Sequence, residues 1–203
     1  MDTAVTPVEF REGAVEVDGA RLRYREAGQG SVLVHLPGPD GLTPALGLLA
    51  QRFRVVILEA GQPPRPAAMV AQAIRRLGLD AFDLMGTASD GATALGLALL
   101  EPTRVRALVL EAPTEGSDGD LERRLPDVAT PTLVLLGTRD DASGAALGRT
   151  CKARIPGSHL VFVYDAGAAV GRDRPQAFAE VVADFLERRE AFVISRARTV
   201  LHP

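Results

Sequence analysis

Cysteine is almost absent from this 203-residue chain, which contains only Cys151. A single cysteine cannot form an internal disulfide, so a disulfide-stabilised secreted scaffold is excluded. The chain also lacks an apolar run of 18 residues and a charged N-terminal stretch followed by an apolar segment. These absences predict neither a membrane-spanning helix nor a secretion signal, and we therefore expect a cytoplasmic protein with no membrane partner.

Clusters of basic residues are missing as well. The formal net charge is -3, and the lysines and arginines are spread along the chain, which argues against nucleic acid as a partner. Metal-ligand spacings, a phosphate-binding loop and a G-x-G-x-x-G motif after the first strand are also absent, so we expect no cofactor and no metal. A small molecule or another protein remains as the expected partner.

The length and the 46% hydrophobic content predict one domain over residues 1–203, because a chain of this size can enclose a single core. Short apolar runs alternate with segments whose apolar residues recur every three or four positions. This alternation predicts an α/β fold, a doubly wound and mostly parallel sheet with helices on both faces. The predicted strands are 14–17, 21–25, 32–36, 55–58, 82–85, 105–110, 132–136 and 160–164, and the predicted helices are 45–51, 67–77, 91–99, 142–154 and 175–189.

The first two predicted strands are separated by Asp18 and Gly19, a pair that favours a tight turn and hence an N-terminal antiparallel hairpin. Later motifs follow the ends of predicted strands, at residues 37–38, 86–91 and 137–140, and a fourth lies at 165–168 before the last helix. With these motifs, the chain from about residue 14 to residue 190 resembles the α/β-hydrolase superfamily. The resemblance implies a hydrolase-like fold with a site at the carboxyl ends of the strands.

The resemblance implies that residues 86–90 form the G-x-S-x-G turn that carries the nucleophile. Ala88 stands at the nucleophile position, and Pro102 follows it by fourteen residues, the interval that the resemblance implies. Alanine has no nucleophilic atom. Ser89 is one residue out of register and is the alternative nucleophile.

The resemblance also places the acid of a catalytic triad at Asp140 and the base at Ala168. Pro175 and Phe178 follow Ala168 by seven and ten residues, the intervals expected for the catalytic histidine. The expected base is therefore a methyl group, so Ala88 and Ala168 both predict a degenerate triad.

Three histidines are present, at positions 35, 159 and 202, and none lies in the loop that should carry the base. We expect each of them to be structural or solvent-exposed. His35 is the strongest candidate for a substitute base, because it lies near the carboxyl end of its predicted strand.

A ligand pocket is expected where Pro37 and Gly38 meet Thr87, Ser89 and Asp90. Main-chain N–H groups at Ser89 and near Gly38 can form an anion-binding corner without the missing side chains. Asp90 stands where the resemblance implies a second glycine. Its carboxylate either stabilises the helix N-terminus or neutralises a corner that would otherwise accept an oxyanion.

The connection between the sixth and seventh strands is short. The resemblance implies a helical cap there, yet only residues 111–130 are available, so we expect a cap that is absent or minimal. A strand-end face of this kind is open to water.

Three functional hypotheses follow. The first is a pseudo-hydrolase that acts as a binding or scaffold protein. The second is a non-hydrolytic cyclase or lyase that uses pocket carboxylates as acid and base. The third is a weak esterase that uses Ser89. Whether the protein is an enzyme stays open at this point.

Overall fold

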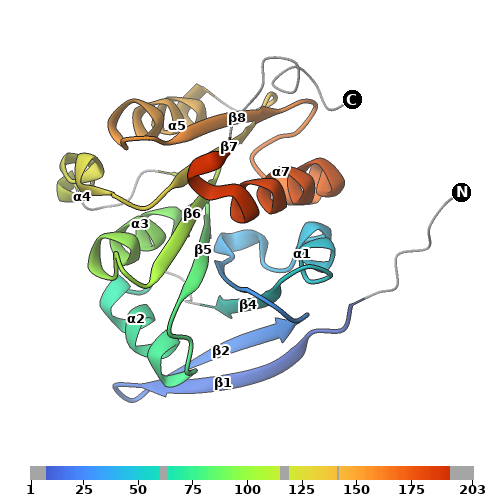
Figure 1. Ribbon diagram of the computed structural model, residues 1–203, viewed down its shortest axis with the longest axis vertical. Coiled ribbons are helices and arrows are strands. Elements are labelled where there is room, and N and C mark those ends of the chain that lie inside the picture. The colour runs from blue at the N-terminus through green and yellow to red at the C-terminus, as the bar shows by residue number, and fades with distance from the viewer. Residues whose placement is uncertain (1–7, 60–63, 115–118, 141, 193–203) are drawn as a thin grey trace, which may run out of the picture.

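An eight-stranded, mostly parallel sheet forms the centre of the computed structural model, which describes residues 8–59, 64–114, 119–140 and 142–192 (Figure 1). The strand order is β1-β2-β4-β3-β5-β6-β7-β8, and only the β1–β2 and β2–β4 pairs are antiparallel. The strands are β1 Arg11–Val17, β2 Ala20–Ala27, β3 Val32–Leu36, β4 Arg54–Glu59, β5 Phe82–Thr87, β6 Val105–Glu111, β7 Thr132–Gly137 and β8 His159–Val163.

Helices cover both faces of the sheet. In Figure 1, α2, α3 and α5 lie on one side of the strands, and α1 and α7 lie on the other. Each side encloses its own cluster of buried aliphatic and aromatic residues, so the sheet is buried on both faces, as parallel sheets require. The helical segments are η1 Gly38–Asp40, α1 Pro44–Leu49, α2 Ala67–Arg76, α3 Asp90–Leu100, α4 Gly119–Arg123, η2 Leu125–Asp127, α5 Ala142–Arg154, α6 Val170–Asp173, α7 Pro175–Arg188 and η3 Arg189–Ala191.

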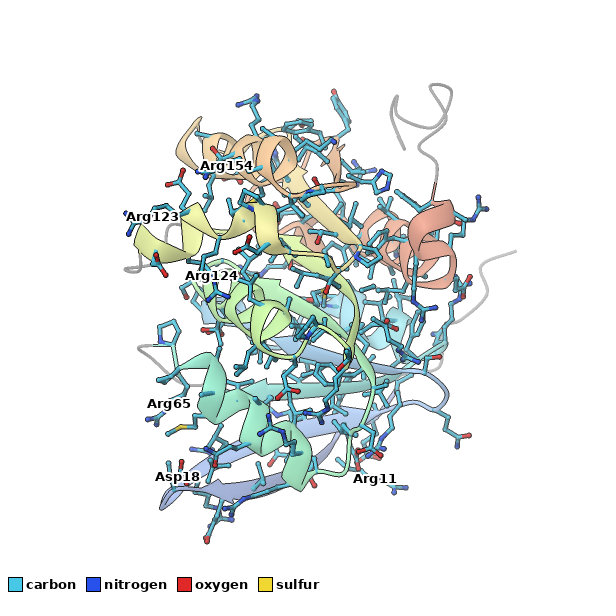
Figure 2. All side chains as sticks on the ribbon, turned by 60° about the vertical axis from the view of Figure 1, so that its left-hand side comes forward. Arg11, Asp18, Arg65, Arg123, Arg124 and Arg154 are labelled. Carbon is cyan, nitrogen blue, oxygen red and sulfur yellow. The ribbon has the colours of Figure 1, made fainter. Side chains whose placement is uncertain are left out.

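The N-terminal hairpin has the predicted turn. Asp18 and Gly19 have φ angles of 48° and 78°, so two successive left-handed residues reverse the chain between Val17 and Ala20. Asp18 lies at the tip of this hairpin in Figure 2, among side chains that point outward.

The predicted fold class is therefore confirmed. Each predicted strand and helix begins and ends within three residues of the observed element. Two strands extend beyond their predicted ends into polar residues, β5 to Thr87 and β6 to Glu111. The prediction stopped at the last apolar residue, whereas backbone pairing continues past it. Between β6 and β7, where we expected a cap that is absent or minimal, the described residues form the short segments α4 and η2.

Within the described part of the chain, no helix is both long enough and apolar enough to cross a membrane. Cys151 is buried and is a free thiol, in keeping with the absence of a second cysteine.

The end of β7 is packed tightly against the loop that follows β8. A Cβ at Gly137 would lie 2.1 Å from the carbonyl oxygen of Ala166 and 2.2 Å from that of Gly167. The N–H of Arg139 donates to the same Ala166 oxygen at 2.8 Å. Only glycine permits this approach, so Gly137 fixes the position of the loop that contains Ala168.

Replacement of Gly137 by alanine should lower the free energy of unfolding by about 3 kcal/mol, because the new Cβ meets backbone rather than a movable side chain. The matched control is Gly47→Ala in α1, where a Cβ meets nothing within 4 Å and where alanine favours the helix by up to about 1 kcal/mol. Urea unfolding of both variants measures the difference. Equal stabilities would contradict the close approach.

Candidate functional site

The turn between β5 and α3 has the backbone of a strained strand-to-helix junction. Ala88 has a φ of +50°, a left-handed conformation that costs a residue with a Cβ about 1–2 kcal/mol. Ser89, the next residue, has φ -61° and ψ -29° and is already in the right-handed helical region. The structure therefore places Ala88, and not Ser89, at the strained position.

Hydrogen bonds and close packing hold this turn. The Ala88 N–H donates to the Glu111 carbonyl at 3.0 Å, and the Ala88 carbonyl accepts the N–H groups of Gly91 at 3.0 Å and Thr114 at 3.2 Å. A Cβ at Gly86 would lie 2.6 Å from the Cβ of Ala94, so a small residue is needed there. The turn is a rigid feature that brings residue 88 to the carboxyl end of the sheet.

Asp90 reaches across from this turn to the loop after β3. Its Oδ2 accepts the N–H of Gly38 at 2.9 Å, and the residue is 3% exposed. Burial raises the pKa of Asp90, and the Gly38 hydrogen bond opposes that shift. Of the two interpretations considered for this carboxylate, the hydrogen bond to Gly38 favours neutralisation of the corner over capping of the helix.

Gly38 completes the contact between the two loops. It has a φ of +59°, and a Cβ there would lie 2.6 Å from the carbonyl oxygen of Thr87. Pro37 before it is buried. The predicted pocket residues are thus neighbours, but the Gly38 N–H expected to serve an anion already has the Asp90 carboxylate as its partner.

A buried chain of hydrogen bonds lies behind the turn, across the ends of β3, β5 and β6. The Thr87 hydroxyl donates to Glu111 Oε2 at 2.9 Å, and His35 Nε2 lies 3.0 Å from the same hydroxyl oxygen. When Glu111 is ionised, the single hydroxyl proton of Thr87 is donated to Glu111, and Nε2 of His35 is then the donor in the second bond. The Gly171 N–H, at the start of α6, donates to Glu111 Oε1 at 2.7 Å.

Burial shifts the pKa values of the two groups at the ends of this hydrogen-bond network, Glu111 and His35. It raises the pKa of Glu111 from 4.5 to about 7, although the hydrogen bonds from Gly171 and Thr87 oppose the shift. Burial lowers the pKa of His35 from 6.5 to about 3. His35 is therefore neutral and buried, and the Thr87 hydroxyl is engaged in these internal hydrogen bonds.

The other histidines lie elsewhere or outside the described residues. His159 is at the start of β8, with its ring centroid 5.1 Å from that of Phe192 and 6.3 Å from that of Phe185. This is the amino end of a parallel strand, the opposite end from the turn at Ala88, so the prediction of a structural role is supported. His202 lies outside the described residues.

The predicted acid and base positions lie on the two loops that Gly137 brings together. Ala168 is exposed in the loop before α6, and Asp140 is half-buried in the bend after β7. Between them, Arg139 forms ion pairs with Asp165 at 3.3 Å and Asp173 at 3.8 Å. The Asp165 carboxylate is thus engaged with Arg139, and its φ of +56° marks it as a turn residue.

Within the ranges that the structure describes, there is no group of three or more histidine, cysteine, aspartate or glutamate side chains that could hold a metal ion.

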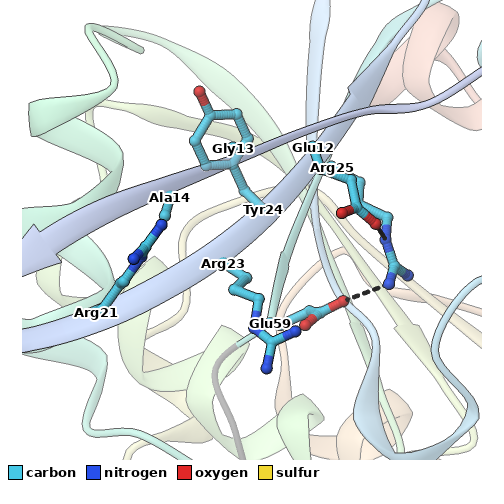
Figure 3. A pocket seen from close by; sticks show the side chains of 8 residues that line it. All are labelled: Glu12, Gly13, Ala14, Arg21, Arg23, Tyr24, Arg25 and Glu59. Carbon is cyan, nitrogen blue, oxygen red and sulfur yellow. Dashed lines mark hydrogen bonds and ion pairs between the residues drawn. The ribbon is translucent and has the colours of Figure 1, made fainter.

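A separate hollow of about 540 Å³ lies over the hairpin, lined by charged residues of β1, β2 and β4 (Figure 3). There Arg25 pairs with Glu12 at 3.1 Å and with Glu59 at 3.3 Å. This hollow is on different strands from the turn at Ala88.

Comparison with known proteins identifies the fold. No family model matches the sequence. A predicted CIB-like hydrolase from Thermoplasma acidophilum superposes with a TM-score of 0.76 at 19% identity, over 88% of this chain and 98% of the other. The chain has an α/β-hydrolase fold.

Two further solved structures agree with this fold. Carboxylesterase CesB from Bacillus subtilis has a TM-score of 0.72 at 16% identity, over 90% of this chain and 93% of the other. A serine hydrolase involved in carbazole degradation has a TM-score of 0.72 at 18% identity, over 88% of this chain and 99% of the other. These likenesses confirm the predicted hydrolase-like fold.

Glu111 is the site residue that sequence reasoning missed. It was treated only as a boundary of the connection after the sixth strand. A carboxylate directly after the apolar run 105–110 was the available signal, because the carboxyl ends of parallel strands converge at one edge of the sheet.

The position of the strained turn can be tested with two glycine variants. Ala88→Gly should raise the free energy of unfolding by about 1 kcal/mol, because glycine adopts φ +50° without a Cβ penalty. Ser89→Gly should lower it by a few tenths of a kcal/mol, roughly the cost of replacing serine by glycine at the N-cap of a helix. Urea unfolding measures both, and the opposite pattern would move the turn by one residue.

The pKa shifts of Glu111 and His35 in this buried hydrogen-bond network predict opposing effects of pH on stability. Glu111 binds its proton more tightly in the folded state, so its contribution is fully present below pH 4.5 and is lost as the pH rises through about 7. His35 binds a proton less tightly when folded, so its contribution is present above pH 6.5 and is lost as the pH falls toward about 3. Between pH 4.5 and 6.5 the two effects oppose each other.

Single variants should reveal each effect. Relative to the wild type, Glu111→Gln should lose on the order of 2 kcal/mol when the pH is lowered from 6.5 to 4.5, and His35→Gln should gain a similar amount. Denaturant unfolding at several pH values measures the slopes. If both variants keep the wild-type slope, neither group has the assigned shift.

Proposed function

We propose that this protein is a non-catalytic member of the hydrolase-fold proteins that binds a ligand at the strand-end site and does not hydrolyse it through a serine, histidine and aspartate triad. The observation that carries the proposal is Ala88 at the strained turn. A nucleophile at that turn is what makes acyl transfer feasible, and a methyl group cannot form a covalent intermediate.

The surroundings of Ala88 support the same conclusion. The loop position expected for the base is Ala168, and His35, the strongest substitute, is buried with its Nε2 engaged by Thr87. A group with a pKa of about 3 is a poor proton acceptor at neutral pH. The Asp90 carboxylate lies against the Gly38 N–H, a donor that a developing oxyanion would need.

The proposal includes an open binding face. The described part of the connection between β6 and β7 consists of the short α4 and η2, which supports a cap that is absent or minimal. An open strand-end site suits reversible binding of a small molecule or a protein segment better than chemistry that needs water excluded. The partner is expected to contact Ala88, Ser89 and Gly38, all of which are half-buried.

A second candidate is a non-hydrolytic enzyme that moves a proton with Asp90. The raised pKa of this carboxyl group favours it, because a general acid or base works best when its pKa lies near the working pH. This candidate differs from the first because it requires turnover of the bound ligand, and Asp90→Asn should abolish that turnover.

The absence of an activated serine can be tested with a fluorophosphonate, which phosphonylates a nucleophilic serine with loss of fluoride. The purified protein should show no mass increase, while an active serine hydrolase treated alongside is labelled completely. Intact-mass spectrometry and peptide mapping measure the adduct. Stoichiometric labelling at Ser89 that disappears in Ser89→Ala would replace the proposal with a weak esterase.

A further inference from the structure

We propose that the corner formed by Gly38, Ser89 and Asp90 binds a cationic hydrogen-bond donor, such as a protonated amine or a guanidinium group, on the Asp90 carboxylate. The inference rests on the proposed binding function and specifies the class of ligand. The carboxylate reverses the polarity that main-chain N–H groups alone would give this corner.

The Gly38 hydrogen bond sets this polarity. Asp90 Oδ2 lies 2.9 Å from the Gly38 nitrogen, so an incoming anion would have to displace a carboxylate that is already in place. An anion bound beside it would also meet a like charge in a partly desolvated site, where charge repulsion is strong. The corner therefore disfavours carboxylate and phosphate ligands.

The second oxygen of Asp90 lacks a partner. Oδ1 is buried and has no hydrogen bond within the described residues. Protonation does not remove this deficit, because a buried O–H at Oδ1 would need an acceptor as much as a buried carboxylate oxygen needs a donor. A donor from outside the chain satisfies the atom, and a charged donor also neutralises the carboxylate.

The surroundings of the corner are suited to such a ligand. Gly38, Ala88 and Ser89 around Asp90 are half-buried, whereas Asp90 itself is 3% exposed, so a ligand reaches its carboxylate only where these neighbours move aside. Asp40, on the Gly38 loop, is near enough to raise the pKa of Glu111 by its charge. Asp40 itself forms an ion pair with Arg172.

Nuclear magnetic resonance can measure the preferred sign of charge at this corner. The folded protein is titrated separately with n-butylammonium chloride and with sodium butyrate at equal ionic strength and mildly alkaline pH, so that Asp90 is ionised. In the wild type, n-butylammonium should shift the amide resonances of Gly38 and Ser89 in a saturable way, and butyrate should bind at least about tenfold more weakly.

Three variants complete the experiment. Asp90→Gly frees the Gly38 N–H and should reverse the preference, so that butyrate becomes the better ligand. Asp90→Asn keeps a carbonyl oxygen that accepts the Gly38 N–H, but its side chain has no charge. This variant should no longer bind n-butylammonium, and it should not bind butyrate more tightly than the wild type does. Asp165→Gly removes an exposed carboxylate at another left-handed turn and should behave as the wild type.

The inference is overturned if butyrate binds the wild type as well as n-butylammonium does, if neither ligand shifts these two resonances, or if Asp165→Gly abolishes binding as fully as Asp90→Asn. If Asp90→Gly does not fold, Asp90→Asn alone decides the role of the charge. Each of these failures leaves the fluorophosphonate result unchanged, so the ligand class and the lack of hydrolysis are tested separately.

Discussion

The buried carboxylate of Glu111 connects the parts of the chain that make up the candidate site. Its two oxygens accept hydrogen bonds from Thr87 at the end of β5 and from Gly171 at the start of α6, while its backbone carbonyl accepts the N–H of Ala88. One residue thereby holds the strained turn, the end of β6 and the loop before the last helix in a fixed relation. Such a carboxylate is retained only because its oxygens have partners inside the protein.

The strained turn at Ala88 is kept although alanine is a costly residue for a left-handed backbone. Strain of this kind persists where the surrounding structure determines it, and here the hydrogen bonds to Glu111, Gly91 and Thr114 do so. The α/β-hydrolase fold thus presents residue 88 at the strand ends, where the alanine side chain offers no reactive atom. In our proposal, the Asp90 carboxylate makes this corner accept a hydrogen-bond donor from a ligand instead of stabilising an oxyanion.

Much of the architecture was predictable from the sequence. The apolar runs and the turn at Asp18 and Gly19 were enough to predict the hairpin, the parallel sheet and the helices on both faces. Strand ends were less predictable, because backbone pairing carries β5 and β6 into Thr87 and Glu111 after the apolar pattern has stopped. The pairing of His35 with Thr87 across 52 residues had no local signal at all.

The sequence by itself determined the fold class, because periodicity is a local property, and it determined that residue 88 is an alanine, which has no nucleophilic atom in any conformation. Only the tertiary structure decided that Ala88 rather than Ser89 has the left-handed backbone, since φ depends on how β5, β6 and α3 pack together. It also decided the partner of Asp90, because the Gly38 N–H lies on a loop 52 residues away and reaches the carboxylate only when β3 and β5 lie side by side in the sheet.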